Sequence, residues 1–152
     1  VFGDAQADSV EDVMKHWQAA KSKEGTQGTL DGVSKGLPGT IKAEQIGKKV
    51  ARDGFDWAKG QDVLDKLQEE LLEFCEASHS GSKQDQEEEF GDILFTLVQY
   101  ARKQGLSAEA ALQNACSKFI RRYEALEKKA GYKQADLSSQ ELEDLWKTIK
   151  DV

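Results

Sequence analysis

Four acidic residues in two short runs have the chemistry and spacing to bind a metal ion. Glu70 and Glu73 lie in the run EELLE, and Glu89 and Asp92 lie in the run EEEFGD. Each pair is three residues apart, so on a helix its side chains sit on neighbouring turns, about 5–6 Å apart at Cβ. Two such helices packed together would bring four negative charges to one place, at a high cost in repulsion and lost hydration. A hard divalent cation relieves that cost, and oxygen-only ligands favour Mg²⁺ or Mn²⁺.

The same acids also have a purely structural explanation. A run of charges on a helix is usually a solvated face. Glu87, Glu88 and Glu89 fall in the first turn of a predicted helix, where acids complement the helix dipole. Glu89 and Asp92 lie well away from the main apolar stripe of that helix, so they should face water unless the helix is contacted on two sides, as in a dimer. Spacing alone leaves a metal site and a solvated face both open.

Three neighbouring residues bear on this choice. Gly91 lies inside the predicted helix, where a glycine costs up to about 1 kcal/mol relative to alanine, and a close helix approach or ligand access beside Asp92 would justify it. Glu76 and His79 form a Glu-x-x-His pattern like those of di-iron bundles. Such sites need two copies, the sequence has one, and His79 is expected beyond the helix end, so di-iron chemistry is disfavoured.

Composition indicates one soluble helical domain over residues 1–152. Charged residues make up 32% and hydrophobic residues 38% of the chain, with a single Pro, a balance typical of soluble helical proteins. No apolar run approaches the roughly 20 residues that span a bilayer, and residues 1–10 lack the basic start and apolar stretch of a signal peptide. We therefore expect a cytoplasmic protein with no membrane partner, in which Cys75 and Cys116 are buried free thiols.

The net charge disfavours nucleic acid as a partner, and the acids and bases are unevenly distributed along the chain. The net charge is −7, opposite in sign to the basic surfaces that bind phosphate backbones. Residues 61–92 hold eleven acids and two bases, whereas residues 101–133 hold eight bases and three acids. An acidic segment that binds metal and a basic segment that binds phosphate would produce this asymmetry. Two solvated helix faces would produce it as well.

Hydrophobic periodicity predicts an all-α bundle of about five to six helices with no strand. The expected helices cover about 9–23, 38–53, 62–77, 84–104 and 107–129, and a last helix begins at Ser138. Ser138 and Glu141 form a capping box, the clearest helix start in the chain. Residues 1–8 and 24–39 are expected to be loops, and a loop as long as 24–39 is often a mobile lid or binding segment.

Three of these helices carry an apolar face that should pack into the core. Each face repeats at the three- and four-residue spacing that marks one side of a helix. The expected core residues are Val63, Leu64, Leu67, Leu71, Phe74 and Cys75, then Phe90, Ile93, Leu94, Leu97, Val98 and Ala101, then Leu112, Ala115, Cys116, Phe119, Tyr123 and Leu126.

Basic residues also occur in helical pairs. Lys118 and Arg122 share one face of the helix over 107–129, and Trp146 and Lys150 share one face of the last helix. Cations placed in this way can neutralise phosphate oxygens. A solvated face or ordinary ion pairs would also explain Lys118 and Arg122, and Trp146 would also serve as a core anchor.

With these residues in view, the chain resembles the MazG family of nucleoside triphosphate pyrophosphohydrolases, in the all-α NTP pyrophosphatase superfamily. The resemblance covers nearly the whole chain and is closest to the C-terminal domain of two-domain MazG proteins. The matching segments are VFGD (1–4), SKGLPG (34–39), GFDW (54–57), DKLQEELLE (65–73), EEEFGDILF (87–95), KFIRRY (118–123) and residues 142–150. Residues 39–47 are richer in glycine than the family pattern. The chain lacks an initiator Met and starts at what resembles the junction after a first MazG domain, so we expect an excised half or a stand-alone version.

The resemblance implies a role for each residue singled out above. It places the metal ligands at Glu70, Glu73, Glu89 and Asp92, with Mg²⁺ as the metal and Mn²⁺ as a substitute. It gives Glu69 or Glu88 the task of orienting a water or accepting its proton, and Lys66 the task of holding a carboxylate or a phosphate. It assigns substrate binding to Lys118, Arg122, Trp146 and Lys150, with Trp146 lining a base pocket or packing.

The resemblance further implies a tight homodimer that hydrolyses an NTP or dNTP to the monophosphate and pyrophosphate, in nucleotide-pool control or house-cleaning. Water would attack the α-phosphorus, metal ions would polarise the phosphate, and the cations would neutralise its oxygens. Two other classes stay open. One is a nucleotide-binding domain with weak or no hydrolysis, and the other is a helical interaction module whose acids serve solubility.

Overall fold

The computed structural model describes residues 28–149, and these residues contain helices and no strand. The helices are α2 (Gly39–Arg52), α3 (Gly60–Ser80), α4 (Lys83–Lys103), α5 (Ala108–Lys129), a short 3₁₀ helix η1 (Gln134–Asp136) and α6 (Ser139–Lys147). The all-α prediction is confirmed. The helix predicted over 9–23, the loop predicted over 1–8, and Lys150 lie outside the described residues. None of the helices in 28–149 combines the length and apolar character needed to cross a membrane.

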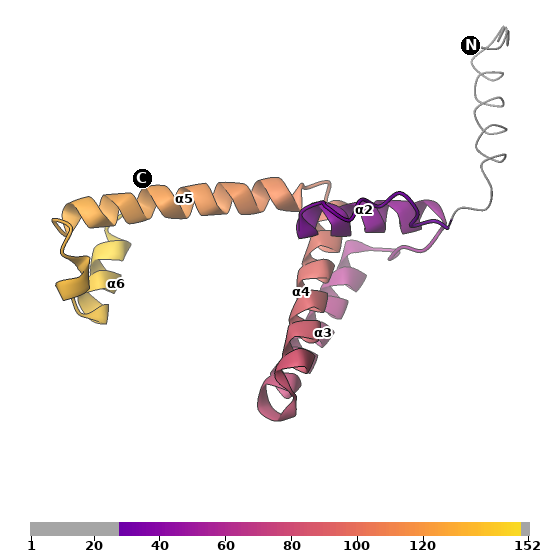
Figure 1. The fold of residues 1–152 in the computed structure, drawn as a ribbon, viewed down its shortest axis with the longest axis horizontal. Helices are drawn as coiled ribbons and strands as arrows, with labels where there is room; N and C mark the ends of the chain where they lie inside the picture. The colour runs from indigo at the N-terminus through magenta and orange to yellow at the C-terminus, as the bar shows by residue number, and fades with distance from the viewer. Residues whose placement is uncertain (1–27, 150–152) are drawn as a thin grey trace, which may run out of the picture.

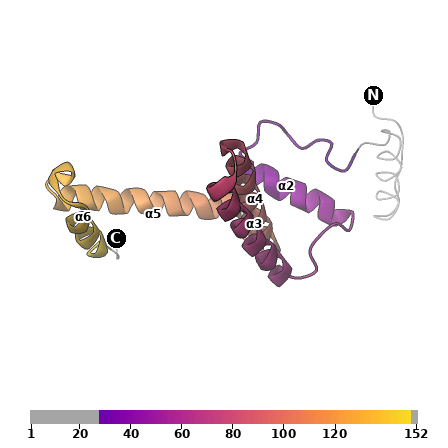
Figure 2. The same cartoon turned by 90° about the horizontal axis from the view of Figure 1, so that it is seen from below.

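The helices form a bent, open arrangement (Figures 1 and 2). α3 and α4 lie side by side as an antiparallel pair, and α2 lies across one end of this pair. α5 leaves the same end and runs away from the pair, and α6 folds back against the far end of α5 in both views. The acidic helices α3 and α4 and the C-terminal helix α6 are therefore separated in space by the length of α5.

A short turn joins α3 to α4, and a helix cap in this turn fixes where α4 begins. α3 runs to Ser80, so His79 lies inside its last turn rather than beyond it as predicted. Ser82 then caps α4: its hydroxyl accepts a hydrogen bond from the Asp85 amide at 3.2 Å, while the Asp85 carboxylate accepts one from the Ser82 amide at 2.7 Å. These hydrogen bonds to Ser82 hold the pKa of Asp85 below its ordinary value. The caps fix where the acids of α4 begin relative to those of α3.

Much of the predicted core is exposed in the single chain. Seven of its members are 40–58% exposed, and both cysteines are exposed: Leu71, Phe90, Leu94, Leu97, Leu112, Phe119, Tyr123, Cys75 and Cys116. On α4, the predicted core residues Ile93 and Val98 are buried, and so are the polar residues Thr96 and Gln99, which were not predicted. Only Leu126 of α5 is buried, because α5 runs away from the other helices. The prediction of buried thiols is wrong for this chain on its own.

α2 and α4 approach so closely that one position admits no side chain. A Cβ added at Gly47 would lie 1.8 Å from Gln99 Oε1 and 2.8 Å from Arg102 Nε. Gln99 is completely buried. It donates to the Ala43 carbonyl oxygen at 2.8 Å and accepts from Arg102 Nε at 2.9 Å. The glycine of α2 therefore makes room for a buried polar link between the two helices, which satisfies both hydrogen-bonding ends of the amide.

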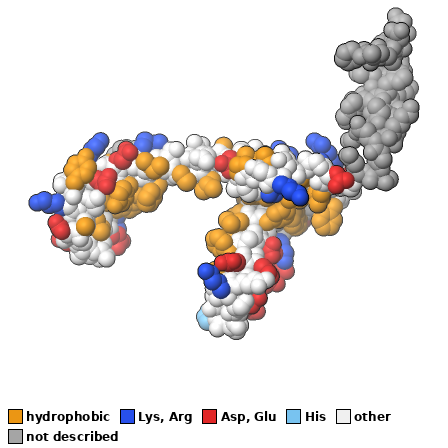
Figure 3. All heavy atoms as spheres, viewed as in Figure 1, with side chains coloured by type: hydrophobic (Ala, Val, Ile, Leu, Met, Phe, Trp, Pro, Cys, Tyr) orange, Lys and Arg blue, Asp and Glu red, His pale blue; other side chains and the backbone are white. Residues whose placement is uncertain are grey.

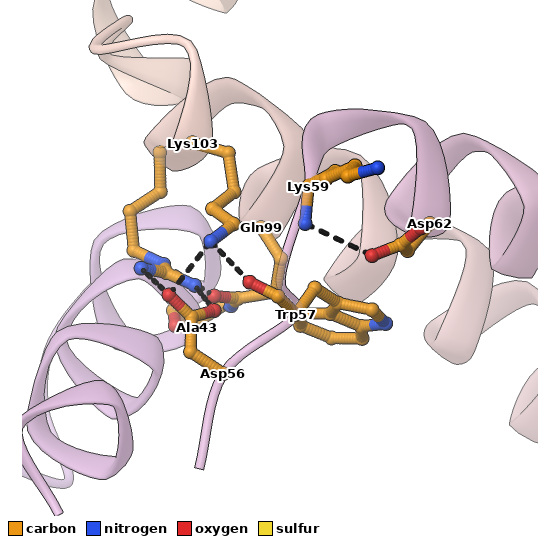
Figure 4. Close-up of polar contacts among 8 residues, drawn as sticks. Ala43, Asp56, Trp57, Lys59, Asp62, Gln99 and Lys103 are labelled. Atoms are coloured by element: carbon orange, nitrogen blue, oxygen red, sulfur yellow. Dashed lines mark hydrogen bonds and ion pairs between the residues drawn. The ribbon is translucent and has the colours of Figure 1, made fainter. Parts of the chain in front are cut away.

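An ion-pair clamp fastens the turn between α2 and α3 to the end of α4 (Figure 4). The Asp56 carboxylate accepts from Arg102 at 2.5 and 3.3 Å and from Lys103 at 3.0 Å. Lys103 also donates to the carbonyl oxygen of Trp57 at 2.5 Å. The Asp56 side chain is only 22% exposed, and the hydrogen bond from Arg102, followed by that from Lys103, lowers the pKa of Asp56 to about 2. The clamp therefore stays charged at any physiological pH.

One polar contact ties the start of α5 to the start of α2. The Thr40 hydroxyl donates to the Glu109 carboxylate, and this bond, followed by one from Gln113, holds the pKa of Glu109 below its ordinary value. Ser107 caps α5 by accepting from the Ala110 amide at 3.2 Å. These contacts set the direction in which α5 leaves the rest of the fold.

Gly47→Ala should destabilise the protein by about 1–3 kcal/mol, because a methyl group at this contact displaces the hydrogen-bonded Gln99 side chain. Gly91→Ala is the matched control. It also replaces a helical glycine, but a Cβ at Gly91 would meet nothing within 4 Å in the single chain, so the predicted close approach is absent from residues 28–149. Gly91→Ala should be neutral or stabilising by up to about 1 kcal/mol. Urea unfolding at equal protein concentration measures both, and equal effects would contradict the close-contact account.

Candidate functional site

Three of the four predicted metal ligands converge between α3 and α4. One carboxylate oxygen from each of Glu70, Glu73 and Glu89 lies within 4.8 Å of the other two. Glu70 is buried at 5% exposure, an unusual state for a carboxylate. Glu89 is half-buried and Glu73 is exposed. Figure 3 shows the acidic side chains gathered along the arm formed by α3 and α4. The cluster is therefore open to solvent on one side and buried on the other.

Asp92 lies beside this cluster and outside the set of mutually close oxygens. It is exposed on α4, one turn after Glu89, and its charge still acts on the Glu89 carboxyl. The expectation that Glu89 faces water in a single chain is wrong. The side of α4 that carries Thr96 packs against its neighbours, and Thr96 itself is buried. Glu89 therefore points toward α3 without any second chain.

The electrostatics of the cluster are those of crowded like charges. Partial burial raises the pKa of the Glu89 carboxyl, and the negative charges of Glu73, Glu70 and Asp92 raise it further. One cation offsets part of this repulsion. Lys66 Nζ lies 2.8 Å from Glu70 Oε1 and 2.6 Å from Glu69 Oε1. Hydrogen bonds to these two carboxylates raise the pKa of Lys66 well above its ordinary value, so the ammonium stays charged.

An aromatic pair and a hydrogen bond hold the two helices together between the acids and the turn. The Phe74 and Phe90 rings lie 5.8 Å apart between centroids, in a tilted arrangement that aromatic pairs prefer. Gln86 donates to the Ala77 carbonyl oxygen at 3.3 Å near the turn. The acids cannot relieve their repulsion by moving apart without breaking these contacts.

The donor set fits a hard divalent cation. Three carboxylates on facing helices offer only oxygen ligands, which suits Mg²⁺ or Mn²⁺ and disfavours metals that prefer sulfur or imidazole. No His joins the cluster within residues 28–149, so the Glu76–His79 pattern does not build a di-iron site there. His79 Nδ1 is instead 2.6 Å from the Cys75 carbonyl oxygen.

Two further acids flank the cluster as the sequence predicted. Glu69 is exposed and pairs with Lys66. Glu88 is also exposed, and its Oε1 accepts from Gln84 Nε2 at 3.0 Å. Each lies next to a cluster residue in the chain, and each keeps one oxygen free of these contacts. The geometry does not choose between them as a proton acceptor.

Of the predicted cations, Arg122 forms a second group with Trp146 at the far end of α5. The Arg122 guanidinium carbon lies 4.0 Å from the Trp146 ring centroid, a cation–π contact. The Phe119 ring packs between two other rings, with centroid distances of 5.3 Å to Trp146 and 6.2 Å to Tyr123. Arg122 Nε is buried and has no hydrogen-bond partner in the described part of the chain. Lys118 lies one turn earlier and is exposed. A cavity of about 590 Å³ opens beside Phe119, Tyr123 and Trp146.

This second group is far from the acids of the same chain. Arg122 lies fourteen residues along α5 from Ala108, about 21 Å at the helical rise per residue. Figures 1 and 2 show that α5 runs away from the α3–α4 pair. The structure therefore brings Glu70, Glu73 and Glu89 together between α3 and α4, and Arg122 together with Trp146 near the end of α5. It does not join these two groups within one chain.

Sequence reasoning missed the buried link at Gln99 and the clamp at Asp56. A glutamine in an otherwise apolar region gives no sign in the sequence that its side chain is buried. Asp56 was noted only as a member of the GFDW segment that resembles the family, with no partner predicted for its carboxylate. Gly47 was the usable signal, because a glycine inside a helix often marks a close approach of another backbone or side chain.

The chain is similar to a known domain family and to curated proteins. Residues 59–126 match the MazG nucleotide pyrophosphohydrolase domain. The chain is 35% identical over 159 residues to a nucleoside triphosphate pyrophosphohydrolase of Escherichia coli, covering 99% of this chain and 60% of that protein. It is 31% identical over 156 residues to the nucleoside triphosphate pyrophosphohydrolase/pyrophosphatase MazG of Thermotoga maritima, covering 99% and 58%. The chain thus spans about three-fifths of the length of these relatives.

The matched residues include all of α3 and α4 and most of α5, so the acid cluster and Arg122 both fall within them. Residues 59–126 thus form a MazG nucleotide pyrophosphohydrolase domain within this chain.

Proposed function

We propose that this chain hydrolyses nucleoside triphosphates, NTP or dNTP, to the monophosphate and pyrophosphate, in nucleotide-pool control or house-cleaning. The observation that carries the proposal is the convergence of Glu70, Glu73 and Glu89 within 4.8 Å. A triphosphate is strongly negative, and the protein carries a net charge of −7. Such a protein needs a cation between its own carboxylates and the substrate, and a three-carboxylate cluster supplies the place for it.

Glu70, Glu73 and Glu89 would hold the metal, with Asp92 as a fourth carboxylate one turn along α4. When bound, Mg²⁺ supplies charge neutralisation and polarisation of the phosphate. Lys66 forms an ion pair with the buried Glu70 carboxylate and holds it in place through a 2.8 Å contact. The chain therefore contributes a preorganised set of oxygens whose repulsion a cation relieves.

The water that attacks the α-phosphorus needs a nearby proton acceptor. Glu69 and Glu88 are the two exposed carboxylates next to cluster residues, and we assign this role to one of them. The bond between the α-phosphorus and the bridging oxygen breaks, and pyrophosphate leaves. Lys118, Arg122 and Lys150 neutralise phosphate oxygens, and the planar guanidinium of Arg122 suits two-point contact with phosphate.

We propose that the chain acts as a homodimer in which each site draws on both copies. Apolar side chains on α3, α4 and α5 stay exposed in one chain, among them Leu94, Leu97 and Ile120. Figure 3 shows hydrophobic side chains along α5 and on the arm. Exposed apolar area of this extent commonly marks an interface. A second copy packed on these faces covers them and also brings its Arg122 group to the acids of the first.

Substituting the cluster should abolish activity without unfolding the protein. Glu70→Gln and Glu89→Gln should each lower pyrophosphate release by at least about a hundredfold, because removing one partner of a charged site costs several kcal/mol. Glu87→Gln is the matched control, because Glu87 lies in the same acidic run but is largely exposed. Its ion pair with Lys83 is long, at 3.8 Å. The assay is release of pyrophosphate and monophosphate from an NTP and dNTP panel with Mg²⁺ or EDTA. Release of single phosphate, or full activity in Glu70→Gln, would sink the proposal.

Glu89→Gln should also separate metal binding from folding. The pKa of Glu89 is raised in the fold, so the fold favours the protonated group, and metal-free stability should rise as the pH falls through that pKa. Removing the charge should therefore raise the melting temperature in EDTA. The same variant should lose most of the rise in melting temperature that Mg²⁺ or Mn²⁺ produces in the wild type. If metal stabilises both proteins equally, the ion binds elsewhere.

Mixed dimers test whether the site is shared between copies. Glu70→Gln and Arg122→Ala chains, co-expressed with different tags and purified as the mixed dimer, should show about half of wild-type activity, because one of the two sites is intact. Each variant purified as its own dimer should be inactive. An inactive mixed dimer would show that both residues serve the same chain's site.

A further inference from the structure

Two aromatic rings join α3 to α4 beside the acid cluster. Phe74 directly follows Glu73 in the chain. Phe90 directly follows Glu89. The two ring centroids lie 5.8 Å apart and the ring planes are inclined at 53°, within the range of favourable aromatic pairs. This contact therefore links the backbone that carries one cluster acid to the backbone that carries another.

Further contacts keep the two helices at a fixed separation. Near the turn, Gln86 donates to the Ala77 carbonyl oxygen at 3.3 Å. Farther from the turn, Ile93 lies one helical turn after Glu89 and is buried at 7% exposure. The carboxylates can adjust by rotation of their side chains, but the spacing of the backbones that carry them is held.

One of the cluster acids has little freedom to rotate. Glu70 is 5% exposed, and its Oε1 lies 2.8 Å from Lys66 Nζ. Close packing and this ion pair restrict the side chain. Glu73 and Glu89 must therefore supply most of any adjustment to the size of a bound cation, and the aromatic pair sets the distance between their backbones.

The radius of a divalent cation decides how far its ligands must move. Mg²⁺ binds oxygen at about 2.0–2.1 Å with near-octahedral geometry, whereas Ca²⁺ binds at about 2.3–2.6 Å with about six to eight ligands. Ca²⁺ in place of Mg²⁺ therefore pushes each oxygen outward by about 0.3–0.5 Å. Selectivity between the two ions depends on the size and flexibility of the site. Two helices held at a fixed separation resist the expansion that the larger ion needs.

We propose that the Phe74–Phe90 pair makes the acid cluster selective for Mg²⁺ over Ca²⁺. Both rings act as positioning residues, because they set the spacing of the acids and do not touch the ion. The assignment rests on the proposed function, since it takes Glu70, Glu73 and Glu89 to be the metal ligands. It goes further than that function, because an oxygen-only set of ligands accepts either ion. Rejection of the larger ion comes from the packing of the helices.

Phe90→Ala tests the assignment by metal binding alone. Phe90 is 50% exposed, so its removal leaves a smaller cavity than a fully buried ring would. Bound Mn²⁺ loses its sharp EPR signal, so titrating Mg²⁺ or Ca²⁺ into the Mn²⁺-loaded protein ranks both ions at one site. In the wild type, Mg²⁺ should displace Mn²⁺ at a lower concentration than Ca²⁺ does. In Phe90→Ala this preference should fall by about three- to tenfold, a range that the loss of one aromatic pair can supply.

Two control variants separate the ring contact from a general loss of stability. Leu94→Ala removes a side chain of matching exposure, 51%, from the same helix. Phe90→Tyr keeps the ring. Both should keep the wild-type preference for Mg²⁺, provided circular dichroism and size-exclusion chromatography show the wild-type fold and assembly. A ring that only stabilises the fold would lower the melting temperature and weaken both ions equally, which leaves the preference unchanged.

Phe74→Leu removes the other ring and gives a second test if Phe90→Ala does not fold. It should also lower the preference for Mg²⁺. The double variant should lower it little further, because the two residues act through one contact.

An unchanged preference in the variants that lack a ring, or an equal fall in Leu94→Ala, would overturn the assignment. A wild-type protein that binds no Mn²⁺ would refute the metal site and this assignment with it. A wild-type protein that shows the expected preference, loses it in Phe90→Ala and hydrolyses no NTP would refute the proposed reaction alone.

Discussion

The repulsion among three carboxylates held between α3 and α4 is the constraint on which the site depends. Glu70 is buried, and the pKa of Glu89 is raised by burial and by its acidic neighbours. The fold tolerates this because Lys66 neutralises part of the charge and because the Phe74–Phe90 pair and the cap at Ser82 prevent the helices from separating. A site built in this way favours a cation over an empty state, and it does so before any substrate arrives.

The second physical feature is the incomplete burial of a single chain. α4 buries Ile93, Thr96, Val98 and Gln99, which leaves Phe90, Leu94 and Leu97 of its apolar stripe exposed. α5 extends from a root held by Thr40 and Glu109, with Arg122 and Trp146 near its far end. The same geometry that separates the cations from the acids in one chain leaves the apolar surface that a second copy would cover. Interface and active site are therefore proposed to form together.

The sequence predicted local structure well and the packing of each helix face poorly. Caps such as Ser82, Ser107 and Ser138 depend on neighbours within four residues, so the pattern reveals them. The convergence of Glu70, Glu73 and Glu89 was predicted from spacing and resemblance together. Which side of α4 is buried depends on α2 and α3, which the sequence of α4 does not contain. The completely buried Gln99 and the exposed Leu94 therefore reversed the expectation drawn from hydrophobic periodicity.

A crystal structure with Mn²⁺ and an NTP analogue that resists cleavage between the α- and β-phosphates tests the central claim most directly. The anomalous signal of Mn²⁺ locates the ion independently of the protein density. We predict a peak within coordination distance, about 2.0–2.3 Å, of Glu70, Glu73 and Glu89 oxygens, bridging to the phosphates. A well-ordered ion and nucleotide bound away from these three carboxylates would contradict the account.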